Sequence, residues 1–69
     1  MKNNILLYGG KSTAFIVYEM LKDKKKKVKY IFDEFIQKPN FKNQSEFSNK
    51  KSDLNKLIKN SNFFFICIG

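Results

Sequence analysis

Three short apolar runs along this chain are separated by stretches in which apolar residues recur at the spacing of a helix. The runs Asn4–Tyr8, Val28–Phe32 and Phe63–Ile68 are rich in branched and aromatic side chains and have the length of strands. Apolar residues at successive positions are typical of strands that are covered on both faces of a parallel sheet. The last run, with its three consecutive phenylalanines, is therefore expected to be a central strand.

The stretch between the first two runs follows the period of an amphipathic helix over Ser12–Lys22. Its apolar face consists of Ala14, Phe15, Val17, Tyr18 and Leu21. We expect Ser12 or Thr13 to cap its start, because hydroxyl oxygens accept hydrogen bonds from the first unpaired amides of a helix. The lysines from Lys22 onward suit its end, where the helix dipole favours cations.

A second helix is expected to begin at Ser52 or Asp53 and to end at residues 60–62. Its apolar face consists of Leu54, Leu57 and Ile58. The preceding segment, Phe35–Asp53, contains the only proline and many polar residues, which predicts a loop. One short strand is expected within it, near Glu46–Ser48.

Strands that alternate with helices predict an α/β fold with right-handed crossovers and a parallel sheet. We expect a single Rossmann-like half-domain over residues 1–69, with a short parallel sheet flanked by helices. A domain of this size buries only about 60% of its unfolded surface, so its stability is marginal. Because the last apolar run stops at Gly69, we expect this chain to be the front part of a longer protein or to associate with another chain.

Composition excludes several classes of site. Cys67 is the only cysteine and the chain has no histidine, which rules out an internal disulfide and argues against a zinc centre or a metal site of any kind. The thiol is interpreted as a small core residue in a reducing compartment. No apolar stretch reaches the roughly 18 residues of a membrane span, and no signal peptide is recognisable, so a cytoplasmic location is expected.

The segment Gly9–Thr13, which reads Gly-Gly-Lys-Ser-Thr, is the strongest candidate for a ligand-binding loop. It follows a predicted strand and opens a helix, where free backbone amides and the helix dipole favour an anion. The spacing does not match a phosphate P-loop, because Ile5 stands where that motif requires its first glycine, and it does not match the dinucleotide fingerprint. A plain strand-to-helix turn without a ligand is the alternative interpretation.

Acidic residues follow the second predicted strand at Asp33 and Glu34, about twenty residues after this loop. In dinucleotide-binding folds an acid at this place accepts hydrogen bonds from ribose hydroxyls. Because the carboxyl ends of parallel strands meet at one edge of the sheet, Asp33 and Glu34 are expected to lie beside the Gly9–Thr13 loop, with Gly69 nearby. The alternative is a solvated strand end. The predicted binding residues are Gly9, Gly10, Lys11, Ser12, Thr13, Asp33 and Glu34, and none is predicted to be catalytic.

Three segments, NILLYGGKSTAFIVYEML, YIFDE and FFFICIG, give the chain a family resemblance. It resembles the N-terminal domain of bacterial sugar acyltransferases of the PglD-like and sialic-acid O-acetyltransferase-like type. The positions that match the family pattern are Tyr8, Gly9, Ala14, Asp33 and Ile68–Gly69. Lys11–Thr13 replace a Gly-Gly-His, Gly10 replaces an alanine and Glu34 replaces a second aspartate.

The resemblance implies a module that binds a nucleotide-linked sugar, such as a UDP-amino sugar, in the synthesis of bacterial surface glycans. It also implies a following left-handed β-helix domain that forms a trimer, binds acetyl-CoA and carries the catalytic histidine. This chain has neither a histidine nor hexapeptide repeats, so it is expected to bind substrate and not to transfer an acyl group alone. Lys11 and Ser12 are bulkier than the two glycines that they replace, so these substitutions are expected to narrow the space for a diphosphate.

Two other functions are considered. The formal net charge of +8, with 14 lysines and no arginine, suggests nucleic-acid binding, and residues 22–29 carry a dense lysine run. That run is predicted to be a solvated connector, and the absence of arginine and of stacking-aromatic motifs disfavours this function. A structural or assembly domain with a decayed ligand site is the other alternative, supported by the substitutions at Lys11–Thr13.

Overall fold

The computed structural model describes residues 3–67 and contains a four-stranded, all-parallel sheet with two helices. In chain order the elements are β1 (Ile5–Tyr8), α1 (Ser12–Asp23), β2 (Val28–Phe32), β3 (Glu46–Ser48), α2 (Lys51–Lys59) and β4 (Phe63–Ile66). The strand order across the sheet is β3-β2-β1-β4. The predicted α/β fold, a small Rossmann-like half-domain, is therefore confirmed.

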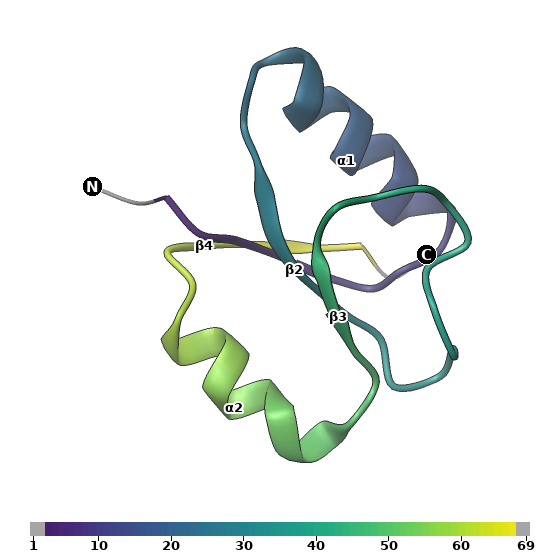
Figure 1. The fold of residues 1–69 in the computed structure, drawn as a ribbon, viewed down its shortest axis with the longest axis vertical. Coiled ribbons are helices and arrows are strands. Elements are labelled where there is room, and N and C mark those ends of the chain that lie inside the picture. The colour runs from purple at the N-terminus through teal and green to yellow at the C-terminus, as the bar shows by residue number, and fades with distance from the viewer. Residues whose placement is uncertain (1–2, 68–69) are drawn as a thin grey trace.

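The helices lie on opposite faces of the sheet, with α1 above it and α2 below it in Figure 1. The residues buried on the α1 side are Ile5, Leu7, Ala14, Val28, Ile31 and Cys67. The smaller core on the α2 side consists of Leu6, Tyr30 and Phe32, with Leu54 and Leu57 packed against it. Successive residues of β1 thus enter different cores, which explains why this strand is apolar at every position.

A register shift lies between β1 and β2. Ile5 pairs with Val28, whereas Leu6 pairs with Tyr30, so Lys29 has no partner on β1. Val28 and Ile31 are three residues apart and would lie on opposite faces of a regular strand. The irregularity allows both side chains to enter the α1-side core, and the exposed Lys29 forms a salt bridge with Glu46 of β3 at 3.4 Å.

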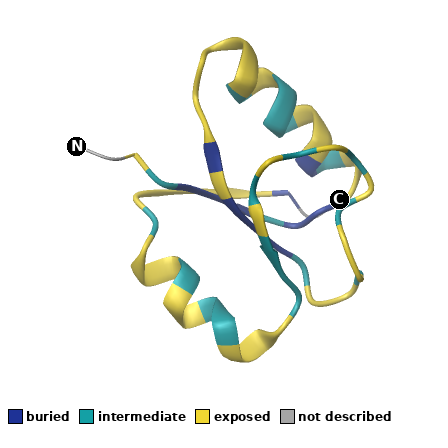
Figure 2. Ribbon diagram, viewed as in Figure 1, coloured by how far each residue is buried: buried dark blue, intermediate teal, exposed yellow. Residues whose placement is uncertain are grey.

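The prediction that the last strand is central is wrong. Among the described residues β4 pairs only with β1, so it is the edge of the sheet. Its side chains are exposed by 52% at Phe63, 51% at Phe64, 38% at Phe65 and 77% at Ile66. Figure 2 shows β4 in yellow beside the dark blue centre of the sheet. An apolar pattern on both faces does not reveal how many neighbours a strand has. The predicted end of this strand, Ile68, lies outside the described residues, as does Gly69.

The predicted side-chain caps are also wrong. Helix α1 begins after Lys11, whose carbonyl accepts the first helical hydrogen bond from the Phe15 amide at 3.0 Å. No side chain in the described part of the chain caps this terminus, and Ser12 lies inside the helix. Helix α2 begins at Lys51, one or two residues earlier than expected, because Lys50 is its N-cap. Within residues 3–67 no helix is long and apolar enough to cross a membrane.

The different burial of two side chains predicts very different losses of stability when each is truncated to alanine. Leu7 is fully buried in β1, whereas the side chain of Ile16 on α1 is 58% exposed. We expect Leu7→Ala to lower the free energy of unfolding by about 2–5 kcal/mol and Ile16→Ala to change it by less than about 0.5 kcal/mol. Urea denaturation followed by circular dichroism measures both. Equal losses for the two variants would contradict the packing described above.

Candidate functional site

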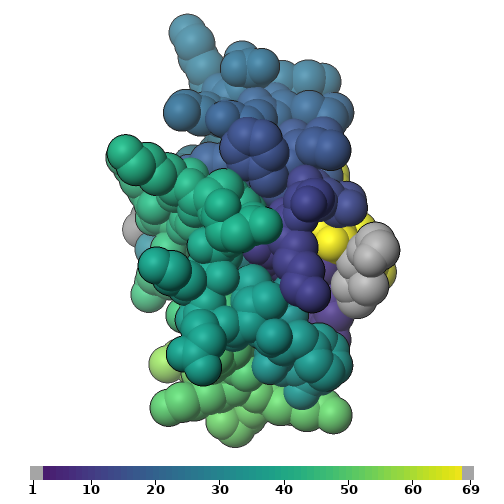
Figure 3. Space-filling view, turned by 90° about the vertical axis from the view of Figure 1, so that its right-hand side faces the viewer, coloured from purple at the N-terminus to yellow at the C-terminus, as the bar shows by residue number. Residues whose placement is uncertain are grey.

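The candidate site lies at the carboxyl edge of the sheet, where the ends of β1, β2 and β4 meet the start of α1. Figure 3 views the molecule onto this edge and shows the purple end of β1 between the teal β2–β3 loop and the yellow end of β4. A pocket of about 310 Å³ opens here. We call it the carboxyl-edge pocket; its lining is Tyr8, Gly9, Lys11, Ser12, Thr13, Phe32, Asp33, Glu34, Phe35 and Cys67.

The order of the strands in the sheet explains why these residues lie together. From β1 the chain crosses to β2 through α1 on one face, and from β3 it crosses to β4 through α2 on the other. Helices on opposite faces leave a crevice between β1 and β4 at their carboxyl ends. Ligands of open α/β sheets bind at such a switch point. Gly9 and Cys67 lie directly after these two strands and border the pocket.

The carboxylate of Asp33 connects two segments of the site. Its Oδ2 accepts a hydrogen bond from the Gly10 amide at 3.0 Å, and its Oδ1 accepts one from the Phe35 amide at 3.0 Å. The first bond ties the β1–α1 loop to the end of β2, and the second turns the chain after β2. The predicted convergence of the Gly9–Thr13 loop with Asp33 and Glu34 is therefore confirmed, whereas the predicted neighbour Gly69 lies outside the described residues.

Close packing explains why positions 9 and 10 are both glycine. Gly9 has φ +126°, and a Cβ there would lie 2.6 Å from the carbonyl oxygen of Cys67. A Cβ on Gly10 would lie 2.7 Å from Cδ1 of Ile36. Gly9 therefore allows the backbone of Cys67, just after β4, to approach closely, and the buried Gly10 lies against Ile36, outside the lining of the pocket. Of the seven predicted binding residues, Gly10 alone does not line it.

The start of α1 supplies the positive end of the site. The first amides of a helix have no acceptor within it, and none of the described residues accepts a hydrogen bond from the amides of Ser12, Thr13 or Ala14. Lys11 stands at the N-cap with an exposed side chain, so a cation lies beside these donors. Together they form an electropositive wall that suits a phosphate or a carboxylate.

The part of the lining that comes from the ends of β1 and β2 and from the residues after β2 is acidic and aromatic. Glu34 is exposed, and no hydrogen bond joins its carboxylate to another described residue, so it can accept from a ligand hydroxyl. Tyr8 and Phe32 lie against each other with ring centroids 5.6 Å apart, and Phe35 is 83% exposed. These three aromatic residues were missed by sequence reasoning, although each stands at or just after a strand end that leads into the predicted loops.

Cys67 forms the floor of the pocket near β4. It is 2% exposed, its sulfur lies 3.4 Å from the Phe65 carbonyl oxygen, and its amide donates to the Tyr8 carbonyl at 2.8 Å. Burial raises the pKa of the Cys67 thiol above its ordinary value of 9.0. The prediction of a core cysteine is confirmed. Within residues 3–67, no group of three or more His, Cys, Asp or Glu side chains gathers to hold a metal ion.

Asp33 gives a stability prediction. Asp33→Ala leaves the Gly10 and Phe35 amides without their acceptor, so we expect a loss of about 1–3 kcal/mol in the free energy of unfolding. Glu34→Ala is the matched control and should change that energy by less than about 0.5 kcal/mol. Urea denaturation at neutral pH distinguishes the two. An unchanged free energy of unfolding in Asp33→Ala would show that these two hydrogen bonds do not stabilise the fold.

Cys67 gives a pH prediction. A pKa that is higher in the folded than in the unfolded chain stabilises the fold fully below the unfolded value, and this contribution disappears as pH rises through the folded value. The stability advantage of the wild type over Cys67→Ala should therefore narrow between pH 7.5 and strongly alkaline pH. Denaturation curves of both proteins at the two pH values measure it, and an unchanged difference would contradict thiol burial.

Comparisons with family models, with curated proteins and with solved structures found no match to this chain. The resemblance to the sugar acyltransferases therefore stays a hypothesis, and the evidence for function is the geometry of the site.

Proposed function

We propose that the chain is a binding module for a nucleotide-linked sugar, with its site in the carboxyl-edge pocket. The observation that carries this proposal is that residues with free amide donors at the start of α1 and acidic residues after β2 line one pocket. Unpaired amides and Lys11 at the start of α1 suit a diphosphate, and Glu34 with Asp33 suits hydroxyl groups of a ribose or sugar. The pocket, at about 310 Å³, lies at the lower end of the usual range for ligand sites.

Several residues in and beside the pocket have distinct roles in this proposal. The amides of Ser12–Ala14 donate to phosphate oxygens, and the Lys11 ammonium neutralises part of their charge. Glu34 accepts hydrogen bonds from hydroxyls. Asp33 keeps the loop closed by accepting hydrogen bonds from two amides, and its two oxygens have further lone pairs that can accept from a ligand hydroxyl. Phe35 offers an exposed ring for a base.

The proposal assigns the acyl-transfer chemistry to another part of a longer protein. In the resembled family an acetyl-CoA-binding β-helix domain supplies the catalytic histidine and the trimer contacts. This chain contains no histidine, so its own contribution would be positional. Holding the sugar by its nucleotide fixes the attacking group relative to a thioester and lowers the entropic part of the barrier.

The main rival is a site that serves only as a strand-to-helix turn in a structural or assembly domain. The packing of Gly9 against Cys67 and of Gly10 against Ile36 favours it, since both glycines are explained without a ligand. The two functions differ in one respect. A turn needs no cation at Lys11 and no free carboxylate at Glu34, whereas a nucleotide site uses both.

The test is a titration of the isotope-labelled protein with UDP, a UDP-linked amino sugar, uridine and inorganic phosphate, followed by amide NMR. We expect saturable shifts at residues 9–13, 33 and 34 with the first two ligands, and weaker or absent shifts with the last two. Lys11→Ala should weaken UDP binding about fivefold, because it removes one exposed ion pair. Lys24→Ala, which removes an exposed lysine at the other end of α1, is the control.

The nucleotide proposal is rejected if millimolar UDP leaves residues 9–13 unshifted. Equal weakening in Lys11→Ala and Lys24→Ala would also contradict it, because the binding would then follow net charge and not the site.

A further inference from the structure

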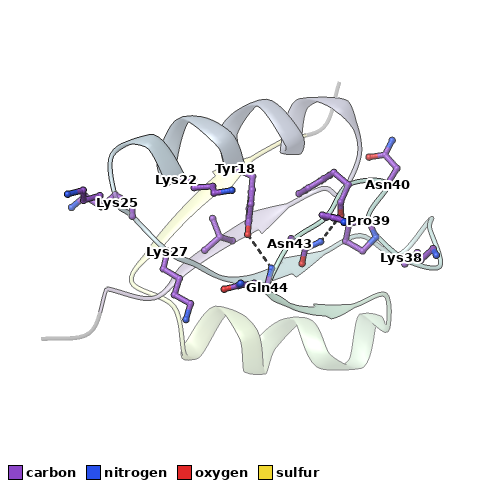
Figure 4. Close-up of a pocket in the computed structure, with 13 residues that line it drawn as sticks. Tyr18, Lys22, Lys25, Lys27, Lys38, Pro39, Asn40, Asn43 and Gln44 are labelled. Carbon is purple, nitrogen blue, oxygen red and sulfur yellow. Dashed lines mark hydrogen bonds between the residues drawn. The ribbon is translucent and has the colours of Figure 1, made fainter.

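A second, larger hollow lies away from the carboxyl-edge pocket and shares no lining residue with it. It has a volume of about 1010 Å³ and lies between the carboxyl half of α1, the α1–β2 connector and residues 38–44 of the β2–β3 segment. We call it the lysine hollow, because six lysines line it: Lys22, Lys25, Lys26, Lys27, Lys38 and Lys42. Figure 4 shows Lys25 and Lys38 at its two ends, with Tyr18, Asn43 and Gln44 between them.

The positive charge of the lysine hollow is not balanced by acidic groups in its lining. Among the described residues no aspartate or glutamate lines it. The one salt bridge within residues 3–67 joins Lys29 to Glu46, and neither residue borders the hollow. Six like charges around one concavity repel one another and attract a polyanion, whose binding releases the counterions that otherwise screen them.

Backbone contacts hold the connector in a defined shape. The Lys26 amide donates to the Leu21 carbonyl at 2.7 Å, and the Lys25 amide donates to the Lys22 carbonyl at 2.9 Å. These two bonds form a Schellman motif at the end of α1. Lys25 has φ +58°, a left-handed conformation in which glycine is the usual residue. The chain therefore places a lysine at the rim where local conformation favours glycine.

The other wall is fixed to α1 by aromatic packing. The Phe41 ring lies 5.4 Å from that of Tyr18 and 5.5 Å from that of Phe15, measured between centroids. The Gln44 amide donates to the Tyr18 hydroxyl at 3.2 Å. The lysine hollow thus combines exposed lysines on a backbone of defined shape with a floor that contains Tyr18, Phe41 and Pro39 and the side-chain amide of Asn40. The Asn43 side chain also lines it and is hydrogen-bonded to the Phe41 carbonyl and the Ser45 amide.

We propose that the lysine hollow binds single-stranded nucleic acid, with phosphates at the lysine rim and bases against the aromatic and amide-bearing floor. A cationic groove with an aromatic surface is the usual design of sites that bind single strands without strict sequence preference. A lysine ammonium serves as a point charge for phosphate. The hollow is concave, whereas a membrane surface is broad and flat, and an acidic peptide has no bases to place on the floor.

The test measures binding of a labelled oligothymidylate of about twelve nucleotides, a length within the span of typical single-strand sites. We expect the affinity to fall with salt at a slope near −0.7 per phosphate contacted. Lys38→Glu with Lys42→Glu reverses two rim charges and should weaken binding at least about tenfold and flatten the slope. The matched control is Lys51→Glu with Lys56→Glu on α2, on the other face of the sheet, which lowers the net charge equally, from +8 to +4.

A third variant separates binding from folding. Lys25→Gly relieves the left-handed strain, so its urea midpoint should be no lower than that of the wild type while its oligonucleotide affinity falls. Polyglutamate of equal charge and phosphatidylserine vesicles are the competing ligands, and each should bind more weakly than the oligonucleotide. Equal loss in the α2 control, tighter binding of either competitor, or a Lys25→Gly variant with full affinity would overturn the proposal.

Discussion

The strand β1 is hydrogen-bonded along both edges, to β2 and to β4, and it is covered on both faces. Leu6 and Leu7 are within 1% of complete burial although they point to opposite sides of the sheet. This double pairing fixes three parallel strands in one direction, so their carboxyl ends meet at one edge. Every group of the carboxyl-edge pocket comes from a segment that leaves the sheet at that edge.

The polar contacts at that edge follow from the same constraint. Once β1 and β2 end side by side, the loop after β1 must turn away within a few residues. The Gly9 amide donates to the Phe32 carbonyl at 2.7 Å, and Asp33 accepts from Gly10. These bonds use the amides of the glycines, while the following amides, at the start of α1, have no helical acceptor. The amides of Gly9 and Gly10 thus close the β1–α1 loop, and the amides that remain free for a ligand follow at Ser12–Ala14.

Sequence periodicity predicted most of the fold because local patterns reflect burial. Both helices, the strands Val28–Phe32 and Glu46–Ser48, and the convergence of Gly9–Thr13 with Asp33 were predicted correctly. The edge position of β4 could not be predicted, because strand order depends on long-range pairing. The predicted caps were wrong because Lys11 is the N-cap of α1, so Ser12 and Thr13 both lie inside its first turn.

The lysine hollow shows a different limit of sequence reasoning. The run from Lys22 to Lys29 was predicted to be a solvated connector, and its lysines are exposed. What the sequence did not reveal is that residues 38–44, which are distant in the chain, close the other side. Phe41 holds this segment in place by packing on Tyr18 and Phe15. A contact between a loop residue and a helix leaves no periodic pattern in the sequence.

A crystal structure of the protein with UDP bound tests the account most directly, because it locates the anion within the fold. The account predicts diphosphate oxygens within hydrogen-bonding distance of the Ser12–Ala14 amides, with a hydroxyl group at Glu34. A complex in which the carboxyl-edge pocket is empty and UDP lies elsewhere on the molecule would contradict it.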